Sequence, residues 1–170
     1  MDLKAHIRHV PDFPKPGILF YDITTLLGRR DGLRATIDQL CAPFVDQGID
    51  AVVGIESRGF ILGAAVADRL GTAFVPIRKP GKLPARCFTE SYELEYGTDA
   101  LQIHADALTD GQRVLVVDDV LATGGTAGAA ARLVSQLGAR LHALAFLIEL
   151  EFLKGRARLP GQDVFSVLKY

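Results

Sequence analysis

The residues best suited to chemistry lie in one run, Val-Leu-Val-Val-Asp-Asp-Val-Leu-Ala-Thr-Gly-Gly-Thr, at residues 114–126. An apolar strand delivers two adjacent carboxylates, and a turn of glycine and threonine follows and opens a helix. Gly124 and Gly125 allow positive φ and a close approach of the backbone to a ligand. Their N–H groups, with the helix N-terminus, form a nest for an anion such as a terminal phosphate.

The paired carboxylates of Asp118 and Asp119 point to a second kind of ligand group. Carboxylates repel a phosphate, but they accept hydrogen bonds from a vicinal diol or lie near a metal ion. Thr123 and Thr126 add hydroxyl donors to the turn. A phosphate at one end and a diol at the other describe a ribose 5-phosphate. The alternative is a polar turn before a capped helix, with solvated aspartates and no ligand.

Elements that could position this run alternate along the chain after residue 30. The sequence predicts strands at residues 51–55, 73–77, 113–117, 142–150 and 163–168, and helices at residues 58–70 and 125–137. An earlier helix is expected to begin at Asp31 as its cap, with one apolar stripe formed by Leu33, Ile37, Leu40, Cys41, Phe44 and Val45. Alternation predicts an α/β fold with a mainly parallel twisted sheet and helices on both faces.

Ligands of such sheets bind beyond the carboxyl ends of the strands, so the residues after each strand are site candidates. Glu-Ser-Arg-Gly at residues 56–59 follows the first strand, and Ser57 could simply cap the next helix. Arg78, Lys79 and Lys82 follow the second strand. They could be solvated loop charges, but their clustering at a carboxyl edge favours a polyanionic substrate.

Residues 84–104 lack a clear period, although residues 91–97 could pair briefly as a hairpin. A long excursion of this kind in a compact domain is usually functional or mobile. Gly81 and Gly97 could serve as its hinges.

Composition narrows the class of protein. The chain has 170 residues, 49% of them hydrophobic and 23% charged, which fits one globular domain. The formal net charge of -1 argues against a basic field for nucleic acid. We expect Cys41 and Cys87 to be reduced thiols of a cytoplasmic protein. We expect neither a signal peptide nor membrane attachment, because the apolar stretches are too short.

The run at residues 114–126 resembles the phosphoribosyl-diphosphate signature of the type I phosphoribosyltransferase family. Four more segments are similar to the adenine-specific members of that family. They are Phe-Pro-Lys-Pro-Gly-Ile-Leu-Phe-Tyr-Asp-Ile at residues 13–23, Gly-Ile-Glu-Ser-Arg-Gly-Phe at 54–60, Ile-Arg-Lys-Pro-Gly-Lys-Leu-Pro at 77–84 and Ser-Tyr-Glu-Leu-Glu-Tyr-Gly at 91–97. The resemblance therefore runs nearly the full length of the chain.

The resemblance implies one domain over residues 1–170, with an N-terminal hood at residues 1–30 and a flexible lid loop at residues 84–104. It implies transfer of the 5-phosphoribosyl group from phosphoribosyl diphosphate to N9 of adenine, which yields AMP and pyrophosphate in purine salvage. Mg²⁺ is implied as the cofactor, bound mainly through the diphosphate, with no direct protein ligand expected. A cytoplasmic homodimer without nucleic-acid or membrane partners is also implied, some of the basic residues reaching a neighbouring subunit's site.

The same resemblance carries residue roles. The residues implied to bind phosphoribosyl diphosphate are Glu56, Ser57, Arg58, Arg78, Lys79, Lys82, Asp118, Asp119, Ala122, Thr123, Gly124, Gly125 and Thr126. The residues implied to bind adenine are Leu19, Phe20, Tyr21 and Arg58. The residues implied to act in catalysis are Glu95, Tyr96, Asp118 and Asp119. One departure is Tyr21, where some members carry a basic residue, and the Glu56–Ser57 peptide is implied to be strained, with a cis bond as the candidate form.

Two rival functions stay open at this stage. A transferase for another nucleobase shares most of these motifs, but enzymes resembling the hypoxanthine–guanine type place an acidic residue where this chain has Ala122. A regulator that binds phosphoribosyl diphosphate without catalysis is the other rival. We expect no DNA-binding domain beside the α/β domain, because 170 residues leave no room for one.

Overall fold

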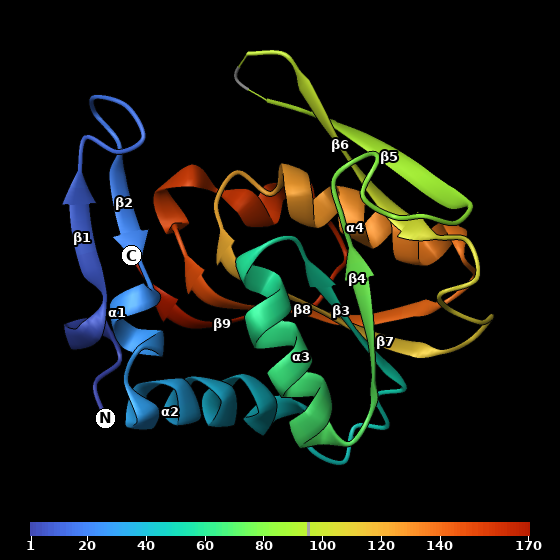
Figure 1. The fold of residues 1–170 in the computed structure, drawn as a ribbon, viewed down its shortest axis with the longest axis horizontal. Coiled ribbons are helices and arrows are strands. Elements are labelled where there is room, and N and C mark those ends of the chain that lie inside the picture. The colour runs from blue at the N-terminus through green and yellow to red at the C-terminus, as the bar shows by residue number, and fades with distance from the viewer. Residues whose placement is uncertain (95) are drawn as a thin grey trace. The chain divides into compact units, whose positions relative to one another are not determined.

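The computed structural model describes residues 1–94 and 96–170 and divides into two compact units, Met1–Gln39 and Leu40–Tyr170. The first unit contains a 3₁₀ turn at Lys4–His6, an antiparallel pair of strands and two helices (Figure 1). The strands are β1 (Arg8–Pro11) and β2 (Leu19–Asp22). The helices are α1 (Thr24–Leu27) and α2 (Arg30–Cys41), and α2 continues two residues past the end of the first unit.

The α2 helix differs from its predicted start. It begins at Arg30, so Asp31 lies inside the first turn rather than at the cap. The expected apolar stripe is confirmed for Ile37, Leu40 and Cys41, which are buried. The stripe ends in the 3₁₀ turn at Ala42–Phe44, beyond which Val45 is 53% exposed. Pro43 ends the helix there, because it removes a backbone donor.

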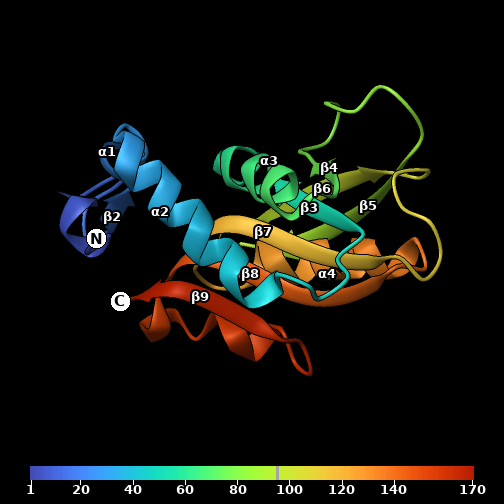
Figure 2. The same ribbon diagram turned by 90° about the horizontal axis from the view of Figure 1, so that it is seen from below.

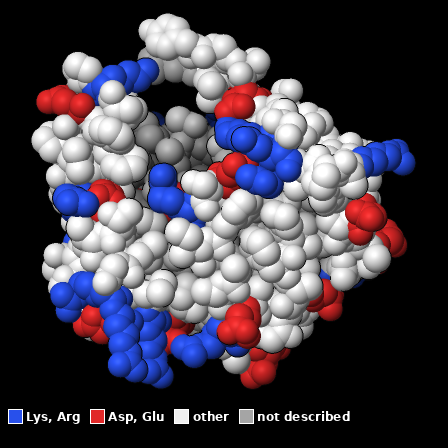
Figure 3. All heavy atoms as spheres, in the orientation of Figure 1, with Lys and Arg blue, Asp and Glu red and all other residues white. Residues whose placement is uncertain are grey.

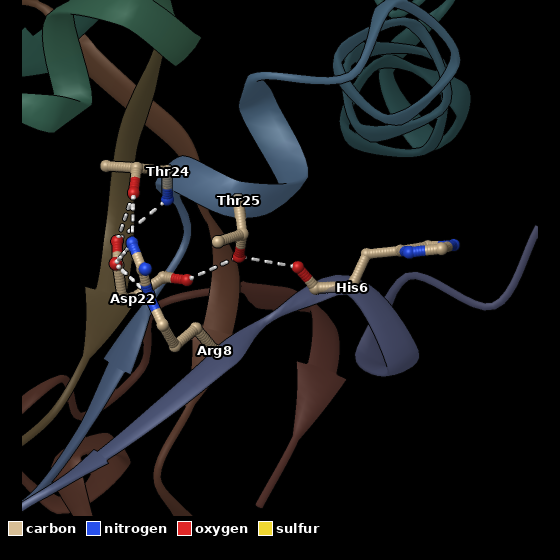
Figure 4. Close-up of polar contacts among 5 residues, drawn as sticks. All are labelled: His6, Arg8, Asp22, Thr24 and Thr25. Carbon is tan, nitrogen blue, oxygen red and sulfur yellow. Dashed lines mark hydrogen bonds and ion pairs between the residues drawn. The ribbon is translucent and has the colours of Figure 1, made fainter.

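The Asp22 carboxylate, at the end of β2, links this strand to β1 and to the start of α1 (Figure 4). Arg8 donates to Asp22 Oδ2 from Nε at 2.9 Å and from Nη2 at 2.7 Å, across the register pair of β1 and β2. Thr24 donates to Oδ1 from its backbone N–H at 2.9 Å and from its hydroxyl at 2.7 Å. These Thr24 bonds, with those of Arg8, lower the pKa of Asp22 to about 2.

The second unit contains a parallel sheet of five strands in the order β4-β3-β7-β8-β9 (Figure 2). Its strands are β3 (Ala51–Ile55), β4 (Ala73–Ile77), β7 (Arg113–Leu121), β8 (Arg140–Glu149) and β9 (Val164–Lys169). Its helices are α3 (Arg58–Leu70) and α4 (Gly125–Gln136), with 3₁₀ turns at Glu151–Leu153 and Gly155–Arg158. The predicted α/β fold is confirmed, and Pro76 lies in the edge strand β4, where a missing donor is tolerated.

Alternate residues of the central strands face two different helices. Val53 and Val116 belong to one buried cluster with Leu133 of α4. Gly54, the next residue of β3, faces α3 instead, since a Cβ added there would lie 2.9 Å from the carbonyl oxygen of Gly59. The sheet is therefore covered by α4 on one face and by α3 on the other, which explains why β3 is buried along its whole length.

The β7 strand is longer than the sequence predicted. It was expected to end at Val117, but its ladder with β8 continues to Leu121, which pairs with Glu149. Asp118 and Asp119 therefore lie within the strand and not after it. The apolar run alone could not reveal this, because the pairing depends on how far β8 extends alongside.

Residues 84–104, which show no clear hydrophobic period in the sequence, contain a regular hairpin. β5 (Cys87–Glu93) and β6 (Thr98–His104) pair over seven positions, from Cys87 with His104 to Glu93 with Thr98. Leu101 and Ile103 of β6 are buried in the core cluster, and this anchors the hairpin. The brief hairpin expected near residues 91–97 is thus part of a longer ladder. Most of the predicted lid loop, residues 84–104, therefore lies in paired strands, and only the tip near Leu94 and Tyr96 lies outside the ladder. The lid role stays a prediction.

The charged side chains do not form a field of one sign on the face seen in Figure 3, where Lys and Arg are interspersed with Asp and Glu. This fits the formal net charge of -1. Over residues 1–94 and 96–170, the structure contains no helix that is both long and apolar enough to cross a membrane.

The depressed pKa of Asp22 gives a testable pH dependence. A carboxyl whose pKa is lower in the folded state stabilises the fold above its unfolded pKa and loses that contribution as the pH falls. We expect the free energy of unfolding to drop between about pH 4 and pH 2, measured by urea denaturation. Asp22→Asn should lower the free energy of unfolding at pH 7 by about 1 kcal/mol and flatten this acid step. Asp68→Asn, at an exposed position of α3, is the control; an equal acid step in both variants contradicts the assignment.

Candidate functional site

The turn between β7 and α4 encloses a small cavity. The cavity has a volume of about 70 Å³ and is lined by Asp118, by residues 122–126 and by Phe146 of β8. It has room for a small group such as a phosphate but not for a whole nucleotide, since pockets for larger ligands hold about 300 Å³ or more. The cavity therefore lies at the start of α4, where the sequence predicted a nest for an anion, and the binding of a phosphate there stays a prediction.

The two glycines of the turn have different roles. Gly124 has a φ of +87°, as expected for a turn that points its amides inward. Gly125 was also expected to have a positive φ, but this is wrong, since Gly125 is the first residue of α4 and is not among the positive-φ glycines. Its small size is needed because a Cβ there would lie 3.1 Å from the ring of Tyr92 on β5.

Asp118 and Asp119, predicted as a pair, have different partners. Asp119 is 6% exposed and accepts a short hydrogen bond from Nε of Arg58, the first residue of α3. Asp118 lines the cavity, and its Oδ1 accepts from the Asp119 N–H at 2.9 Å. Burial, and then the charge of Asp119, raise the pKa of Asp118 well above its usual range. Gly59 makes room for Asp118, because a Cβ there would lie 2.7 Å from Oδ1.

The turn between β3 and α3 contains a cis peptide bond between Glu56 and Ser57, which confirms the form implied by the resemblance. Ser57 occupies the N-cap position of α3, but its side chain makes no capping hydrogen bond. The simple capping interpretation of Ser57 is therefore not supported. Its exposed side chain and the start of α3 border the Arg58–Asp119 ion pair.

Glu56 joins this turn to the basic residues after β4. Its Oε2 accepts from the backbone N–H of Lys79 at 2.9 Å, and its Oε1 accepts from Nη2 of Arg78 at 3.1 Å. The Lys79 N–H and then Arg78 lower the pKa of Glu56. Glu56 was predicted to bind phosphoribosyl diphosphate; in this structure its carboxylate accepts from the Arg78 side chain and from the Lys79 backbone, and the substrate role stays a prediction.

Lys79 is held by two hairpin residues that the sequence analysis missed. Its Nζ makes a short ion pair with Asp99 and a hydrogen bond of 3.1 Å with the Tyr92 hydroxyl, 5.7 Å from that ring's centre. Burial lowers the pKa of Lys79, but the bonds to Asp99 and Tyr92 outweigh it and raise that pKa. Tyr92 and Asp99 face each other in the β5–β6 register, so recognising the full hairpin would have suggested them.

Other predicted residues lie apart from these contacts. Lys82 is exposed, although its charge contributes to the low pKa of Glu56. Tyr96 is 80% exposed near the hairpin tip, and Glu95 lies outside the described residues. Leu19, Phe20 and Tyr21 form most of β2 in the first unit.

The β2 side chains predicted to bind the base have aromatic neighbours within the first unit. Phe20 packs edge-on against Phe13, and Tyr21 against His9, each with ring centres 5.1 Å apart. Leu19 is 44% exposed.

Within the described part of the chain, no group of three or more His, Cys, Asp or Glu side chains is arranged to hold a metal ion. The two aspartates of β7 and Glu56 still provide carboxylate oxygens, the donor type that Mg²⁺ prefers. One carboxylate of that set, Asp118, has no cationic partner at hydrogen-bond distance among the described residues and lines the cavity.

Known proteins share both the sequence and the fold. The phosphoribosyl transferase domain family matches residues 30–166. An adenine phosphoribosyltransferase of Synechococcus sp. is 64% identical over 163 residues, covering 95% of this chain and 93% of that protein. The adenine phosphoribosyltransferase of Acidobacterium capsulatum is 59% identical over 168 residues, covering 99% and 93%.

Solved structures agree with this. The adenine phosphoribosyltransferase of Thermoanaerobacter pseudethanolicus matches with a TM-score of 0.97 at 50% identity, over 99% of this chain and 98% of the other. The enzyme of Saccharomyces cerevisiae, solved with adenine and an imino-altritol bisphosphate, matches with a TM-score of 0.94 at 44% identity, over 98% and 97%. The chain belongs to the adenine phosphoribosyltransferases, a branch of the phosphoribosyl transferase domain family.

Proposed function

We propose that this protein transfers the 5-phosphoribosyl group of phosphoribosyl diphosphate to N9 of adenine, with AMP and pyrophosphate as products. The observation that carries the proposal is the phosphate-sized cavity of residues 122–126 with Asp118 in its wall. A nest of amides for the 5′-phosphate beside a carboxylate for the ribose hydroxyls matches a ribose 5-phosphate. The adenine and bisphosphate bound by the yeast relative support the choice of substrates.

The ribose is the part of the substrate that becomes cationic. Breaking the bond between C1′ and the diphosphate oxygen gives the sugar oxocarbenium character. Asp118 and Asp119 then serve as hydrogen-bond acceptors for the ribose diol and as negative charges near the developing cation. Ala122, Thr123, Gly124, Gly125 and Thr126 hold the 5′-phosphate and so fix the position of C1′.

The leaving diphosphate gains negative charge and needs cations and N–H donors. We assign this role to Arg58, to the backbone of Ser57, and to Arg78, Lys79 and Lys82. Glu56 orients the Arg78 guanidinium and fixes the Lys79 backbone. Mg²⁺ bound to the diphosphate oxygens would neutralise further charge on the leaving group. The ion would be held mainly by the substrate, and Asp118 and Asp119 of β7 would offer further carboxylate oxygens.

The base is assigned to β2 and to Arg58. We propose that backbone carbonyls near Leu19 and Tyr21 accept hydrogen bonds from the exocyclic amine of adenine, and that Phe20 stacks on the purine. Glu95 holds or accepts the proton of the purine, and the Tyr96 ring covers the reacting centre against water when the hairpin tip closes.

We also propose that the protein acts as a homodimer in the cytoplasm. The basic residues after β4 are then available to a neighbouring site, as Lys82 is exposed in this chain. Cys41 and Cys87 are both free thiols, which fits a reducing compartment.

Base choice gives the direct test of this function. Adenine, hypoxanthine and guanine are each supplied with phosphoribosyl diphosphate and Mg²⁺, and nucleotide formation is followed by ultraviolet absorbance. We expect adenine to be preferred by about 10⁴-fold in kcat/KM, because a C6 carbonyl would face acceptors without a hydrogen-bond donor. Comparable turnover of hypoxanthine contradicts the base assignment, and no turnover of any base favours the non-catalytic regulator.

The aspartates of β7 should separate activity from stability. Asp118→Asn and Asp119→Asn should each weaken transition-state binding by roughly 2–4 kcal/mol, measured as kcat/KM. The raised pKa of Asp118 means that its ionised form opposes folding, and this penalty grows as the pH rises above the unfolded value. Asp118→Asn should therefore leave the free energy of unfolding at pH 7 equal to or above that of the wild type.

Asp119→Asn is the matched comparison, because it removes the carboxylate that pairs with Arg58. We expect this variant to lose stability, since it removes the ion pair between Arg58 and the buried Asp119 carboxylate. Wild-type kcat/KM in both variants would exclude the ribose role.

Closure of the hairpin tip is tested by Glu95→Gln, Tyr96→Phe and Tyr96→Ala. Glu95→Gln should lower kcat by about 10²-fold if the carboxylate handles the proton. Tyr96→Ala should raise hydrolysis of phosphoribosyl diphosphate relative to AMP formation, and Tyr96→Phe should raise it less because the ring remains. The 80% exposure of Tyr96 predicts changes in stability within about 0.5 kcal/mol.

Limited proteolysis supplies the control for closure. Cleavage near the tip should be suppressed by the substrates, and Phe152→Ala, which removes another exposed aromatic ring, should change neither cleavage nor hydrolysis. Ligand-independent cleavage together with unchanged kcat in Glu95→Gln argues against a lid.

A further inference from the structure

The chain after β8 turns back against the phosphate-binding turn. We call residues 154–158 the support turn. Its Gly155 is buried, and a Cβ added there would lie 2.4 Å from the carbonyl oxygen of Ala122. In the other direction, a Cβ added to Gly124 would lie 2.4 Å from the carbonyl oxygen of Gly155. The two turns therefore pack backbone against backbone at these glycines, with side-chain atoms of Leu121 and Arg158 beside the contact.

An ion pair between the buried Glu149 and the partly exposed Arg156 holds the support turn in place. Glu149, the last residue of β8, is 4% exposed. Its Oε1 accepts from Nε of Arg156 at 2.6 Å, and its Oε2 accepts from Nη2 at 2.8 Å. Arg156 also donates from Nη1 to the Val164 carbonyl of β9 at 2.9 Å. Because both carboxylate oxygens accept a hydrogen bond, the guanidinium is held in one orientation as well as at one distance.

The ion pair is linked to the substrate site through both of its ends. Glu149 is directly opposite Leu121 in the β7–β8 register, and Leu121 is the residue before the phosphate-binding turn. The N–H of Leu150 donates to the Leu121 carbonyl at 3.0 Å. Arg156 follows Gly155 in the chain, so its position sets where Gly155 meets Ala122 and Gly124.

We propose that Glu149 and Arg156 are positioning residues for the 5′-phosphate. The pair keeps Gly155 against Ala122 and Gly124, and this contact keeps the backbone amides of residues 122–126 aimed at the phosphate. The inference rests on the proposed function, because it takes the cavity at residues 122–126 as the phosphate site. Amides held before the ligand arrives need no reorganisation on binding, and small displacements of such groups weaken binding steeply.

A purely stabilising role is the competing explanation. Burying an ion pair is often no better for stability than packing apolar residues of similar size. An apolar replacement of the pair can therefore restore the fold without restoring the geometry of the support turn. The readout that separates the two roles is the affinity for the phosphate end of the substrate.

The test measures binding of ribose 5-phosphate and, separately, of pyrophosphate by calorimetry. Glu149→Gln removes the charge of the pair, and Gly155→Ala leaves the pair intact but inserts a methyl group against Ala122. Both variants should lose about tenfold or more in affinity for ribose 5-phosphate, with pyrophosphate affinity within about twofold of the wild type. The KM for phosphoribosyl diphosphate should rise in the same proportion, while the KM for adenine stays constant.

Two further variants complete the test. Glu151→Gln breaks the exposed ion pair with Lys169 and removes a charge that acts on Arg156, but it keeps both hydrogen bonds between Arg156 and Glu149, so both affinities should stay within about twofold of the wild type. The double variant Glu149→Leu, Arg156→Leu should recover thermal stability relative to Glu149→Gln but not the affinity for ribose 5-phosphate. Recovery of both properties assigns the pair to stability alone and overturns the proposal.

Wild-type affinity for ribose 5-phosphate in folded Glu149→Gln and Gly155→Ala overturns it as well. If Glu149→Gln does not fold, Gly155→Ala decides the question, because it keeps the ion pair. A wild-type protein that binds ribose 5-phosphate without using adenine overturns the proposed function and leaves this inference standing.

Discussion

Asp118 and Asp119 occupy neighbouring positions in β7. Their negative charges repel each other, and burial removes much of the water that would solvate the two carboxylates. Two neighbours offset this electrostatic cost. Arg58 supplies a positive charge to Asp119, and Gly59 leaves space beside Asp118 that no other residue would leave. Both neighbours belong to the first turn of α3, so the start of this helix lies against Asp118 and Asp119 of β7. Glu56 and Ser57 form the short connection between β3 and this helix start.

The same electrostatic constraint extends across the sheet to the hairpin. Glu56, next to the start of α3, orients Arg78 and Lys79 beyond the neighbouring strand β4. Lys79 then reaches Asp99 of β6, and β6 is anchored in the core by Leu101 and Ile103. Buried apolar contacts hold the hairpin base, while ion pairs align the residues at its edge. The described tip residues Leu94 and Tyr96 are 49% and 80% exposed, so their side chains contribute little to the core.

The sequence predicted the parts of this arrangement that depend on local chemistry. Apolar runs located the strands, and the Gly-Gly turn after β7 located the small cavity at the start of α4. It could not predict that β7 continues through Asp118 and Asp119, because strand length depends on pairing with β8. The sequence analysis explained Gly125 by a positive φ. The structure instead relates its small size to the ring of Tyr92, which lies more than thirty residues earlier in the chain. Contacts between residues distant in sequence, such as those of Asp99 and Gly155, carry no local pattern at all.

Three of the four cationic side chains assigned to the substrate are already paired with carboxylates in the free protein. Arg58 pairs with Asp119, Arg78 with Glu56, and Lys79 with Asp99. Each pairing lowers the attraction that a bare cation would exert on a polyanion, so affinity is lower than the count of positive charges suggests. In return, each cation is held in one orientation before the substrate arrives, and less side-chain entropy is lost on binding. A diphosphate that loses its bond to C1′ gains charge only at that moment. Donors held in advance then stabilise the transition state more than the ground state, which is the condition for catalysis.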